Sequence, residues 1–341
     1  MLAVAGIGTA DVGVFLGTSG AFAADDALTP EKFADRFEQV YGKHDGFRRN
    51  HAKGVSLTGT FRSNGAGAEV CEASVFASGE FPVTGRFSLS GGMPHAADTG
   101  STVRGLALRF ELPRGEQWRT AMVNIPVFLD RTPEGFADRI VASAPVAATG
   151  KPDPARMAEF LRSHPETVKA MAYVKARPPT AGFADSTFHG LNAFRATNAT
   201  GRTVPVRWTF EPGPHTPVPA PAEGDGKLFD GVVAAVEQAP LSWRLVLTVG
   251  DPGDPTDDAT VPWPDYRRRI TAGTLTITSA QAEAEGNARD LNFDPTVLPA
   301  GLAVSDDPLL SARSAVYAQS FRRRAGEPKQ PSAVQFKEVR A

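Results

Sequence analysis

The sequence predicts an α+β protein in which a closed or strongly curved antiparallel β-sheet carries helical insertions. Three observations support this fold class. Short runs rich in β-branched and aromatic residues, broken by Gly and Asn, extend from Val55 to Val123. A block with helical patterning follows, and strand patterning then resumes before one last helix near the C-terminus. Many antiparallel strands around inserted helices are typical of this class.

The N-terminal part is expected to contain one helix and a set of strands. Thr29 can cap a helix that begins at Pro30, and Phe33, Phe37 and Val40 share one face of it. The following runs have the composition of antiparallel strands. They are Val55–Phe61, Glu69–Phe76, Gly85–Leu89, Val103–Glu111 and Trp118–Val123.

Helices dominate the middle of the chain, and strands return after them. The helices are expected at Thr132–Ala147, Asp153–Ser163 and Pro165–Ala176, and Pro178-Pro179 ends the block. The later strands are expected at Ser186–Thr197, Thr203–Phe210, Leu241–Thr248 and Arg268–Thr278. Residues 198–201 form the turn between the first two, and a Pro/Asp-rich loop, Asp251–Asp265, separates the last two. A final helix runs from Pro308 to about Arg324, capped by Asp306 or Asp307.

Composition excludes several classes of protein. The 341 residues include 36 Lys and Arg against 38 Asp and Glu, a net charge of −2. This balance argues against a dedicated nucleic-acid binder, which usually has a basic excess. A chain of this length buries about 75% of its unfolded surface and needs no disulfide or metal to fold. The single cysteine, Cys71, permits neither an internal disulfide nor a cysteine-based zinc cluster. A redox cofactor would have to be held by one of six His or four Tyr side chains.

The N-terminus has the character of an export signal. Residues 1–23 are small and apolar and end in Ala21-Phe22-Ala23, which resembles a secretory cleavage site. We therefore expect a signal peptide at 1–23, a single domain at 24–341, and a periplasmic or secreted protein. Two features count against an export signal, since Asp11 interrupts the apolar run and no basic residue precedes it. A start codon set too far downstream would explain the missing basic residues. The alternatives are a disordered tail or a short anchor. No later segment reaches the roughly 18 uninterrupted apolar residues of a membrane span.

Three separated segments contain the candidate functional residues. They are Arg48–Gly54 before the first strand, Asn124–Phe128 at the end of a strand, and Arg313–Tyr317 on the last helix. Each has an ordinary structural explanation when taken alone. His51 in a basic loop is more often solvated or structural, and Asn124 before Ile-Pro suits a turn. Arg313 and Tyr317 are four residues apart and meet on one helical face.

Taken together, the segments resemble successive motifs of the catalases. The matching motifs are Arg48-x-x-His51-Ala52-Lys53-Gly54, Gly85-Arg86-Phe87-Ser88, Arg104–Phe110, Asn124-x-Pro126-Val127-Phe128 and Arg313-x-x-x-Tyr317. Their order and approximate spacing agree from Tyr41 to Phe321. The chain is shorter than ordinary catalases, and residues 294–313 resemble the small haem-containing catalase-related peroxidases. This resemblance implies a catalase-like closed barrel, a C-terminal helix that carries the haem ligand, and haem b as the cofactor.

The resemblance also implies a role for each motif residue. Tyr317 is the iron ligand, since tyrosine holds haem in catalases. Arg313, one turn earlier, supplies a positive charge that favours the phenolate. His51 transfers a proton from one peroxide oxygen to the other, and Asn124 donates a hydrogen bond to the peroxide. Ser88 matches the serine that orients the distal histidine.

Further residues match those that surround the haem edge. Arg48, Arg86 and Arg324 fall at positions that bind the haem propionates. Arg324 lies seven residues after Tyr317, on the same side of the helix. Phe136 either covers a haem edge or belongs to the core. Two nearby arginines, Arg322 and Arg323, are expected to be solvated residues that complement the helix dipole.

The sequence departs from the family pattern in several places. Asn50 replaces the apolar residue that commonly precedes the distal histidine, and Leu129 stands where many members have a second aromatic residue. The stretch Gly91–Ala97 also diverges. The long N-terminal arm and the C-terminal extension of catalases are absent, as are recognisable residues of their NADPH site. These differences predict a more open haem pocket.

The function that follows is a haem-dependent peroxidase. It would reduce hydrogen peroxide, and also small organic hydroperoxides, with an organic electron donor, and would have weak catalase activity. Its partners are therefore peroxide and a small-molecule reductant, and the sequence does not identify the reductant or the oligomeric state. Two alternatives remain open. One is an allene oxide synthase-like isomerase of fatty-acid hydroperoxides, which the Asn50 change leaves open. The other is a non-catalytic haem-binding protein, which would need neither His51 nor Asn124.

Overall fold

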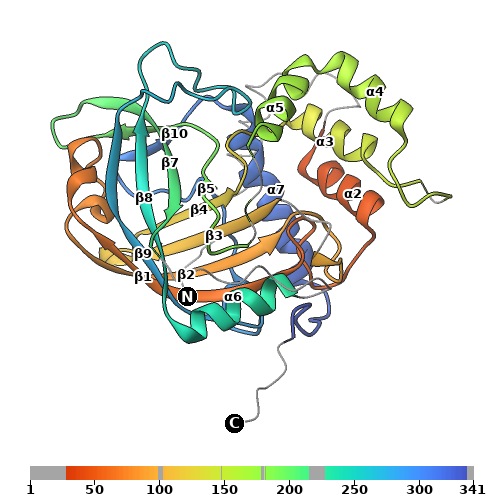
Figure 1. The fold of residues 1–341 in the computed structure, drawn as a ribbon, viewed down its shortest axis with the longest axis horizontal. Helices are drawn as coiled ribbons and strands as arrows, with labels where there is room; N and C mark the ends of the chain where they lie inside the picture. Colours follow the sequence, from red (N-terminus) through yellow and green to blue (C-terminus); the bar gives the residue numbers. More distant parts are fainter. Residues whose placement is uncertain are drawn as a thin grey trace, which may run out of the picture.

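An antiparallel sheet that closes on itself dominates the molecule (Figure 1). The computed structural model describes residues 28–98, 103–146, 148–177, 180, 182–214 and 227–335. Residues 1–23, to which the signal-peptide prediction applies, lie outside this part of the chain, and so do Pro178 and Pro179. Within the described residues, no helix is both long enough and apolar enough to cross a membrane.

Ten strands form the sheet, in the order β10-β6-β7-β5-β4-β3-β2-β1-β9-β8. A further pairing of β7 with β8 closes the eight strands from β7 through β5 to β8 into a barrel, and β6 and β10 extend it beyond β7. The strands are β1 (Gly54–Ser63), β2 (Gly79–Leu89), β3 (Arg104–Glu111), β4 (Gln117–Val123), β5 (Phe188–His189), β6 (Phe194–Thr197), β7 (Thr203–Pro212), β8 (Leu241–Val249), β9 (Arg269–Gln281) and β10 (Leu302–Val304). The structure therefore confirms the predicted α+β fold class with a closed antiparallel barrel.

Aromatic side chains fill the interior of the barrel. Along β4 every second residue is buried, which is the pattern of a strand with one face toward a core. The Trp118 ring stacks on Phe110 at 4.6 Å between centroids and meets Trp208 edge-on at 5.1 Å. Such pairs contribute about 0.5–1.5 kcal/mol each beyond the burial of their area. The rigid interior fixes the strand ends, from which several cavity residues project.

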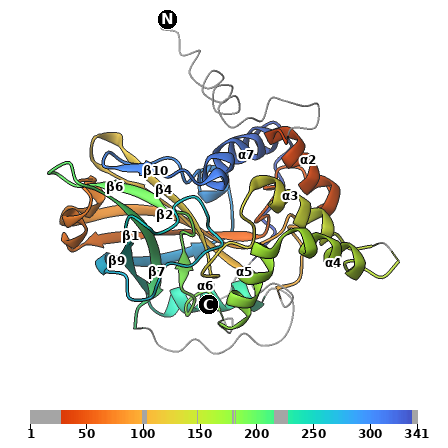
Figure 2. The ribbon, with the colours of Figure 1, turned by 90° about the horizontal axis from the view of Figure 1, so that it is seen from above.

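The helices lie outside the barrel. They are α2 (Pro30–Tyr41), α3 (Pro133–Ala142), α4 (Pro154–Ser163), α5 (Pro165–Lys175), α6 (Lys227–Gln238) and α7 (Pro308–Ala325). The last helix, α7, runs along one side of the barrel, and α2 and α3 pack against it (Figures 1 and 2). Phe33 and Phe37 of α2 form a small second core with Ile140 of α3. As predicted, Thr29 caps α2 through its side-chain oxygen.

Several predicted elements are confirmed, whereas the segment Glu69–Phe76 is not a strand. It begins at the end of one short 3-10 helix, η1 (Ala66–Glu69), and ends with another, η2 (Ser74–Phe76), and the two are joined by a largely buried loop. Gly67 packs so closely on Phe76 that an added Cβ would lie 2.7 Å from its ring. The apolar residues of this segment are buried because they pack into the main hydrophobic core. The sequence pattern of such a buried loop resembles that of a strand.

Other elements differ in extent or were not anticipated. The helix expected at Thr132–Ala147 ends at Ala142, and the strand expected at Ser186–Thr197 is divided into β5 and β6. The break occurs where Leu191 adopts a φ of 65°, a left-handed conformation that takes the chain out of the sheet. Helix α6, whose apolar residues Leu228, Phe229 and Val232 are buried, was not predicted from the sequence. The short strand β10 was not predicted either.

Candidate active site

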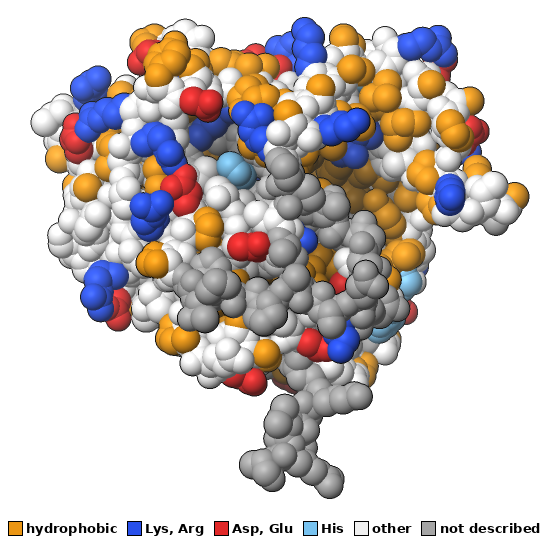
Figure 3. Space-filling model, in the orientation of Figure 1, with side chains coloured by type: hydrophobic (Ala, Val, Ile, Leu, Met, Phe, Trp, Pro, Cys, Tyr) orange, Lys and Arg blue, Asp and Glu red, His pale blue; other side chains and the backbone are white. Residues whose placement is uncertain are grey.

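A cavity lies between the barrel wall and α7, and most of the predicted site residues line it. They are His51, Ser88, Arg48, Arg86, Arg313, Arg324, Phe136 and Tyr317. The volume open to the centre of a water molecule is about 200 Å³, whereas a single water needs roughly 10–15 Å³. The cavity is therefore large enough for a sizeable ligand. Phe33, Phe37 and Phe136 contribute apolar walls to the cavity. Figure 3 shows hydrophobic side chains gathered on the face of the molecule near α2 and α3.

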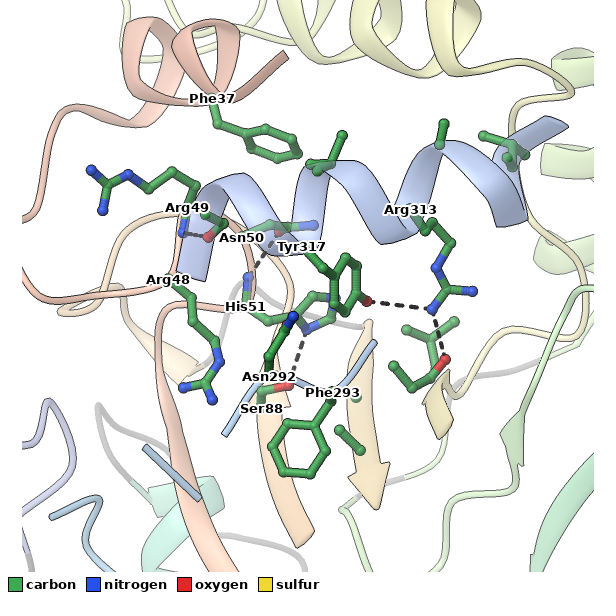
Figure 4. Close-up of a pocket in the computed structure, with 18 of the residues that line it drawn as sticks. Phe37, Arg48, Arg49, Asn50, His51, Ser88, Asn292, Phe293, Arg313 and Tyr317 are labelled. Atoms are coloured by element: carbon green, nitrogen blue, oxygen red, sulfur yellow. Dashed lines mark hydrogen bonds between the residues drawn. The ribbon is translucent and has the colours of Figure 1, made fainter. Parts of the chain in front are cut away.

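His51 lies in the loop just before β1 and is held by Ser88 of β2 (Figure 4). Its ring nitrogen Nδ1 is 3.0 Å from the Ser88 hydroxyl oxygen. Gly105 of β3 leaves room for this pair, because a Cβ there would lie 2.7 Å from Ser88 Oγ and 3.0 Å from His51 Nδ1. The pairing occupies Nδ1 and leaves Nε2 as the nitrogen that can exchange a proton with a ligand.

Burial and neighbouring cations keep His51 neutral. Burial, followed by the charges of Arg86, Arg313 and Arg48, lowers the pKa of His51 to about 3. Both effects disfavour the imidazolium form. The side chain is therefore a neutral base throughout the physiological pH range, which is the state that can accept a proton.

Asn124 is the predicted site residue that is not among the side chains lining the cavity. It follows β4 directly, and its neighbour Val123 does line the cavity. The Asn124 side-chain oxygen accepts a hydrogen bond from the backbone N–H of Arg104 at 2.8 Å. Its own backbone N–H donates to the Arg104 carbonyl at 3.0 Å. Asn124 thus pairs with Arg104 and continues the hydrogen bonds between β3 and β4 for one more residue, next to the cavity.

Tyr317 and Arg313 meet on the face of α7 that borders the cavity (Figure 4). The Arg313 guanidinium donates to the Tyr317 hydroxyl oxygen at 3.3 Å and to the carbonyl of Ala121 at 2.9 Å. It also donates to the side-chain oxygen of Asn192 at 2.6 Å. The Asn192 amide in turn donates to Asp307 at 2.7 Å. Asp307 also caps α7, because its other carboxylate oxygen accepts from Leu309 N–H at 2.9 Å.

This chain of contacts contains a residue that the sequence analysis missed. Asn192 lies 121 positions from Arg313, and no local motif marks it. It reaches the site because the chain leaves the sheet at Leu191, between β5 and β6. Asp307 was predicted as a helix cap, but its link to Asn192 was not. The contacts join the cap of α7 to the phenol of Tyr317.

The three arginines Arg48, Arg86 and Arg324 gather at one end of the cavity around a buried carboxylate. Arg86 binds Glu283 through two parallel hydrogen bonds of 2.8 and 2.9 Å, and Arg48 donates to the same carboxylate at 3.1 Å. Burial alone would raise the pKa of Glu283, but Arg86 and Arg48 together hold it below its usual value. The sequence analysis missed Glu283 because it is 197 positions from Arg86.

Backbone carbonyls satisfy part of the same arginine cluster. Arg48 and Arg324 both donate to the carbonyl of Leu291, at 2.9 and 2.8 Å. Burial lowers the pKa of Arg324 to about 10, so it remains charged at neutral pH. Three guanidinium groups and one carboxylate leave a net charge of about +2 at this end of the cavity. Each guanidinium has five N–H donors, so Arg48 and Arg324 keep donors beyond those used here.

Phe136 belongs both to the cavity wall and to the small helical core. Its ring meets Phe128 at 5.1 Å and Phe37 at 6.0 Å between centroids, in edge-on geometry. Phe136 therefore lines the cavity and also packs against the small helical core, and its role at a haem edge stays a prediction.

The residues present fit the haem that the sequence resemblance implies. One face offers a phenol supported by a guanidinium, a suitable ligand for ferric iron. One end carries three arginines, which match the two carboxylates of a haem. The remaining walls are largely apolar, as a porphyrin requires. In the described part of the chain, no group of three or more His, Cys, Asp or Glu side chains could hold a metal ion.

Comparison with known proteins agrees with this geometry. The family model described as Catalase matches residues 16–218. A catalase-related peroxidase from Synechococcus elongatus is 36% identical over 334 residues, which cover 94% of this chain and 93% of its own. A second protein of that name, from Mycolicibacterium paratuberculosis, is 31% identical and covers 88% of this chain and 96% of its own.

Solved structures show the same fold. Catalase A from Saccharomyces cerevisiae matches with a TM-score of 0.72 and 20% identity, covering 89% of this chain and 65% of the yeast chain. A bacterial catalase matches with a TM-score of 0.73 and 22% identity, and there 64% of the solved chain is covered. The present chain thus spans slightly less than two thirds of these catalases. The family-model match and the extent of the sequence identity show that the protein belongs to the catalase family.

Proposed function

We propose that the protein is a haem-dependent peroxidase that reduces hydrogen peroxide, and also small organic hydroperoxides, with an organic electron donor. We propose haem b as its cofactor and a weak catalase activity beside the peroxidase activity. The observation that carries this proposal is the meeting of a neutral histidine and an arginine-supported tyrosine in one large cavity. The two curated relatives named catalase-related peroxidase, which match most of the chain, support it.

His51 acts in the proposed reaction as the group that moves a proton. Its Nδ1 is occupied by Ser88, so Nε2 takes the proton from one oxygen of the peroxide and returns it to the other, departing oxygen. The low pKa of His51 keeps the ring neutral before peroxide arrives. In the tautomer in which Nδ1–H donates to the Ser88 hydroxyl oxygen, Nε2 is the nitrogen free to accept a proton. Ser88 fixes the plane of the ring, so that the proton is received and delivered in one orientation.

Tyr317 and Arg313 would hold the iron on the α7 side of the cavity. A haem bound here would supply the redox chemistry of O–O cleavage. The Arg313 guanidinium, 3.3 Å from the Tyr317 oxygen, stabilises negative charge on that oxygen. Arg48, Arg86 and Arg324 would bind the propionates at the cationic end of the cavity.

The proposal is tested by the haem spectrum of the purified protein and of two variants. The wild type should bind one haem per chain, and Tyr317→Phe should lose haem or show a changed ligand spectrum. His51→Ala should keep the tyrosine spectrum but react with peroxide about 10²–10⁴-fold more slowly, the usual contribution of a general acid–base. A wild type without haem, or a Tyr317→Phe protein with an unchanged spectrum, would overturn the assignment. The rate of oxygen release, compared with the rate of donor oxidation, then shows whether catalase or peroxidase activity is the larger.

We also propose that the protein is exported to the periplasm or secreted. The small apolar segment that ends in Ala21-Phe22-Ala23 supports this proposal. Fractionation of cells that express the natural gene, with N-terminal sequencing, tests it. We expect the mature chain to begin at Ala24 and to leave the cytoplasm. A protein that stays in the cytoplasm with its first residues intact would contradict the proposal.

A further inference from the structure

The side chain of Asn50 holds the loop that carries His51. Its oxygen Oδ1 accepts a hydrogen bond from His51 N–H at 2.9 Å (Figure 4). The same oxygen accepts a second backbone hydrogen bond, from Gly91 N–H at 2.9 Å. Asn50 also lines the cavity. One side chain therefore joins the histidine loop to the loop after β2, next to the ligand space.

The loop needs such support because His51 has a strained backbone. Its φ of 55° is left-handed, a conformation that costs a residue other than glycine about 1–3 kcal/mol. Arg86 holds the other side of the turn by donating to the carbonyls of His51 and Ala52, at 2.7 and 3.1 Å. Ala52 N–H donates to the Gly91 carbonyl at 3.0 Å. Asn50 and Arg86 thus fix the peptide groups on both sides of His51.

Two departures of this sequence from the catalase pattern meet in this contact. Asn50 stands where an apolar residue is common, and Gly91 opens the divergent stretch Gly91–Ala97. An apolar side chain at position 50 would offer no acceptor to the two N–H groups. The hydrogen bond from Gly91 N–H to Asn50 Oδ1 brings the two departures into direct contact. The chain therefore contains its own support for the histidine loop.

We propose that Asn50 is a positioning residue for proton transfer by His51, acting through the hydrogen bonds that it accepts from the backbone of His51 and Gly91. The inference rests on the proposed function, in which His51 accepts a proton from the ligand. Asn50 fixes where the imidazole stands relative to Ser88 and to the ligand. A misplacement of about 1 Å in such a group can cost on the order of 10²-fold in rate.

The test is the rate at which hydrogen cyanide binds to the ferric holoprotein, measured per haem by stopped-flow absorbance. Hydrogen cyanide must give up its proton when it binds as an anion, so the rate reports the distal base without any turnover. Asn50→Val should slow binding at least tenfold. Asn50→Asp keeps both acceptor bonds and should restore the rate at pH 8 to within a few-fold of the wild type. Its added negative charge should move the acid limb of the pH profile to higher pH.

Asn198→Val is a matched control. Asn198 also accepts two backbone N–H bonds through Oδ1, from Thr200 and Arg202, but in the exposed turn between β6 and β7. Its variant should lose thermal stability and keep the wild-type binding rate. A slow Asn198→Val protein would show that any loosened turn slows binding, and would contradict a specific role for Asn50.

The outcomes separate this inference from the proposed function. If His51→Ala binds cyanide as fast as the wild type, or the wild type takes up no haem, the proposed function fails. If His51→Ala is slow while Asn50→Val keeps the wild-type rate, the positioning role of Asn50 alone is wrong. If Asn50→Val does not fold, the test uses the isosteric Asn50→Asp instead. If the cyanide-binding rate of Asn50→Asp has the same pH profile as that of the wild type, the inference is wrong.

Discussion

At the scale of single residues, the protonation state of His51 gives the clearest prediction. The folded-state pKa of about 3 lies below the ordinary value of 6.5, so the neutral base dominates at every pH above about 4. The rate of reaction with peroxide, measured per haem, should therefore be flat between about pH 5 and 8 and fall only in stronger acid. Stopped-flow measurements in buffers of constant ionic strength test this. An inflection near pH 6.5 would show that His51 is solvated.

Gly105 allows a second prediction at this scale. Gly105→Ala would place a methyl group 2.7 Å from Ser88 Oγ and 3.0 Å from His51 Nδ1, so the pair must separate. We expect haem binding to be kept and the rate with peroxide to fall by about tenfold or more. Gly231 of α6 is the control, because an added Cβ there meets nothing within 4 Å. Gly231→Ala should leave the rate unchanged and stabilise the protein by about 0.5–1 kcal/mol. Equal rates for both variants would contradict the prediction.

At the scale of elements, α7 carries the proposed iron ligand and depends on its N-terminal cap. Asp307 is buried, accepts from Leu309 N–H and also from the Asn192 amide that holds Arg313. A disturbance at the start of the helix can thus reach Tyr317, two and a half turns later. The cap and the ligand form one unit, although they lie ten positions apart in the sequence.

Asp307→Ala should therefore affect both stability and the iron ligand. Loss of the cap costs about 1 kcal/mol, and an unsatisfied Asn192 amide adds about 1–3 kcal/mol. Urea unfolding at equal haem loading measures the first effect, and the ligand spectrum measures the second. The neighbouring Asp306 serves as the control, because it binds Thr256 in an exposed contact. Asp306→Ala should change neither the free energy of unfolding nor the ligand spectrum by a comparable amount. If Asp307→Ala is destabilised but its ligand spectrum is unchanged, the predicted link between the helix cap and Tyr317 is wrong.

At the scale of the whole molecule, the sequence predicted what local patterns determine. Helix caps such as Thr29 and strand runs such as Trp118–Val123 depend on neighbouring residues only. The ordered motifs identified His51, which precedes the first strand, and Tyr317, which follows the last one. The prediction for Glu69–Phe76 was wrong because distant parts of the chain decide its burial. Glu283 and Asn192 were not predicted, because their partners lie 197 and 121 positions away. Side chains with distant partners leave no periodic signal.

Glu283 shows how such long-range contacts hold the molecule together. It follows β9, and its partners Arg86 and Arg48 lie on β2 and before β1, so the ion pairs join three neighbouring parts of the barrel wall. Arg48 and Arg324 share the carbonyl of Leu291, which connects the same cluster to α7. The charges that would receive the haem propionates therefore also attach the ligand helix to the barrel.

Glu283→Gln should destabilise the whole fold, because it leaves buried arginines without their counter-charge. We expect a loss of about 3–5 kcal/mol in the free energy of unfolding. Glu80, which pairs with Arg62 in a contact exposed by 51% and 79%, is the control. Glu80→Gln should cost less than about 1 kcal/mol. Urea unfolding of the two variants, with matched haem loading, measures both values, and similar losses would contradict the prediction.

The pH dependence of this difference tests the charge itself. Because the pKa of folded Glu283 lies below its ordinary value of 4.5, its ionisation stabilises the fold above about pH 4.5. That stabilisation is lost as the pH falls through the lower folded-state pKa, where the carboxylate takes up a proton. The gap between wild type and Glu283→Gln should therefore be full at pH 7 and shrink in acid. A gap that stays constant down to about pH 3 would mean that shape and hydrogen bonding at position 283, rather than its charge, hold the arginines in place.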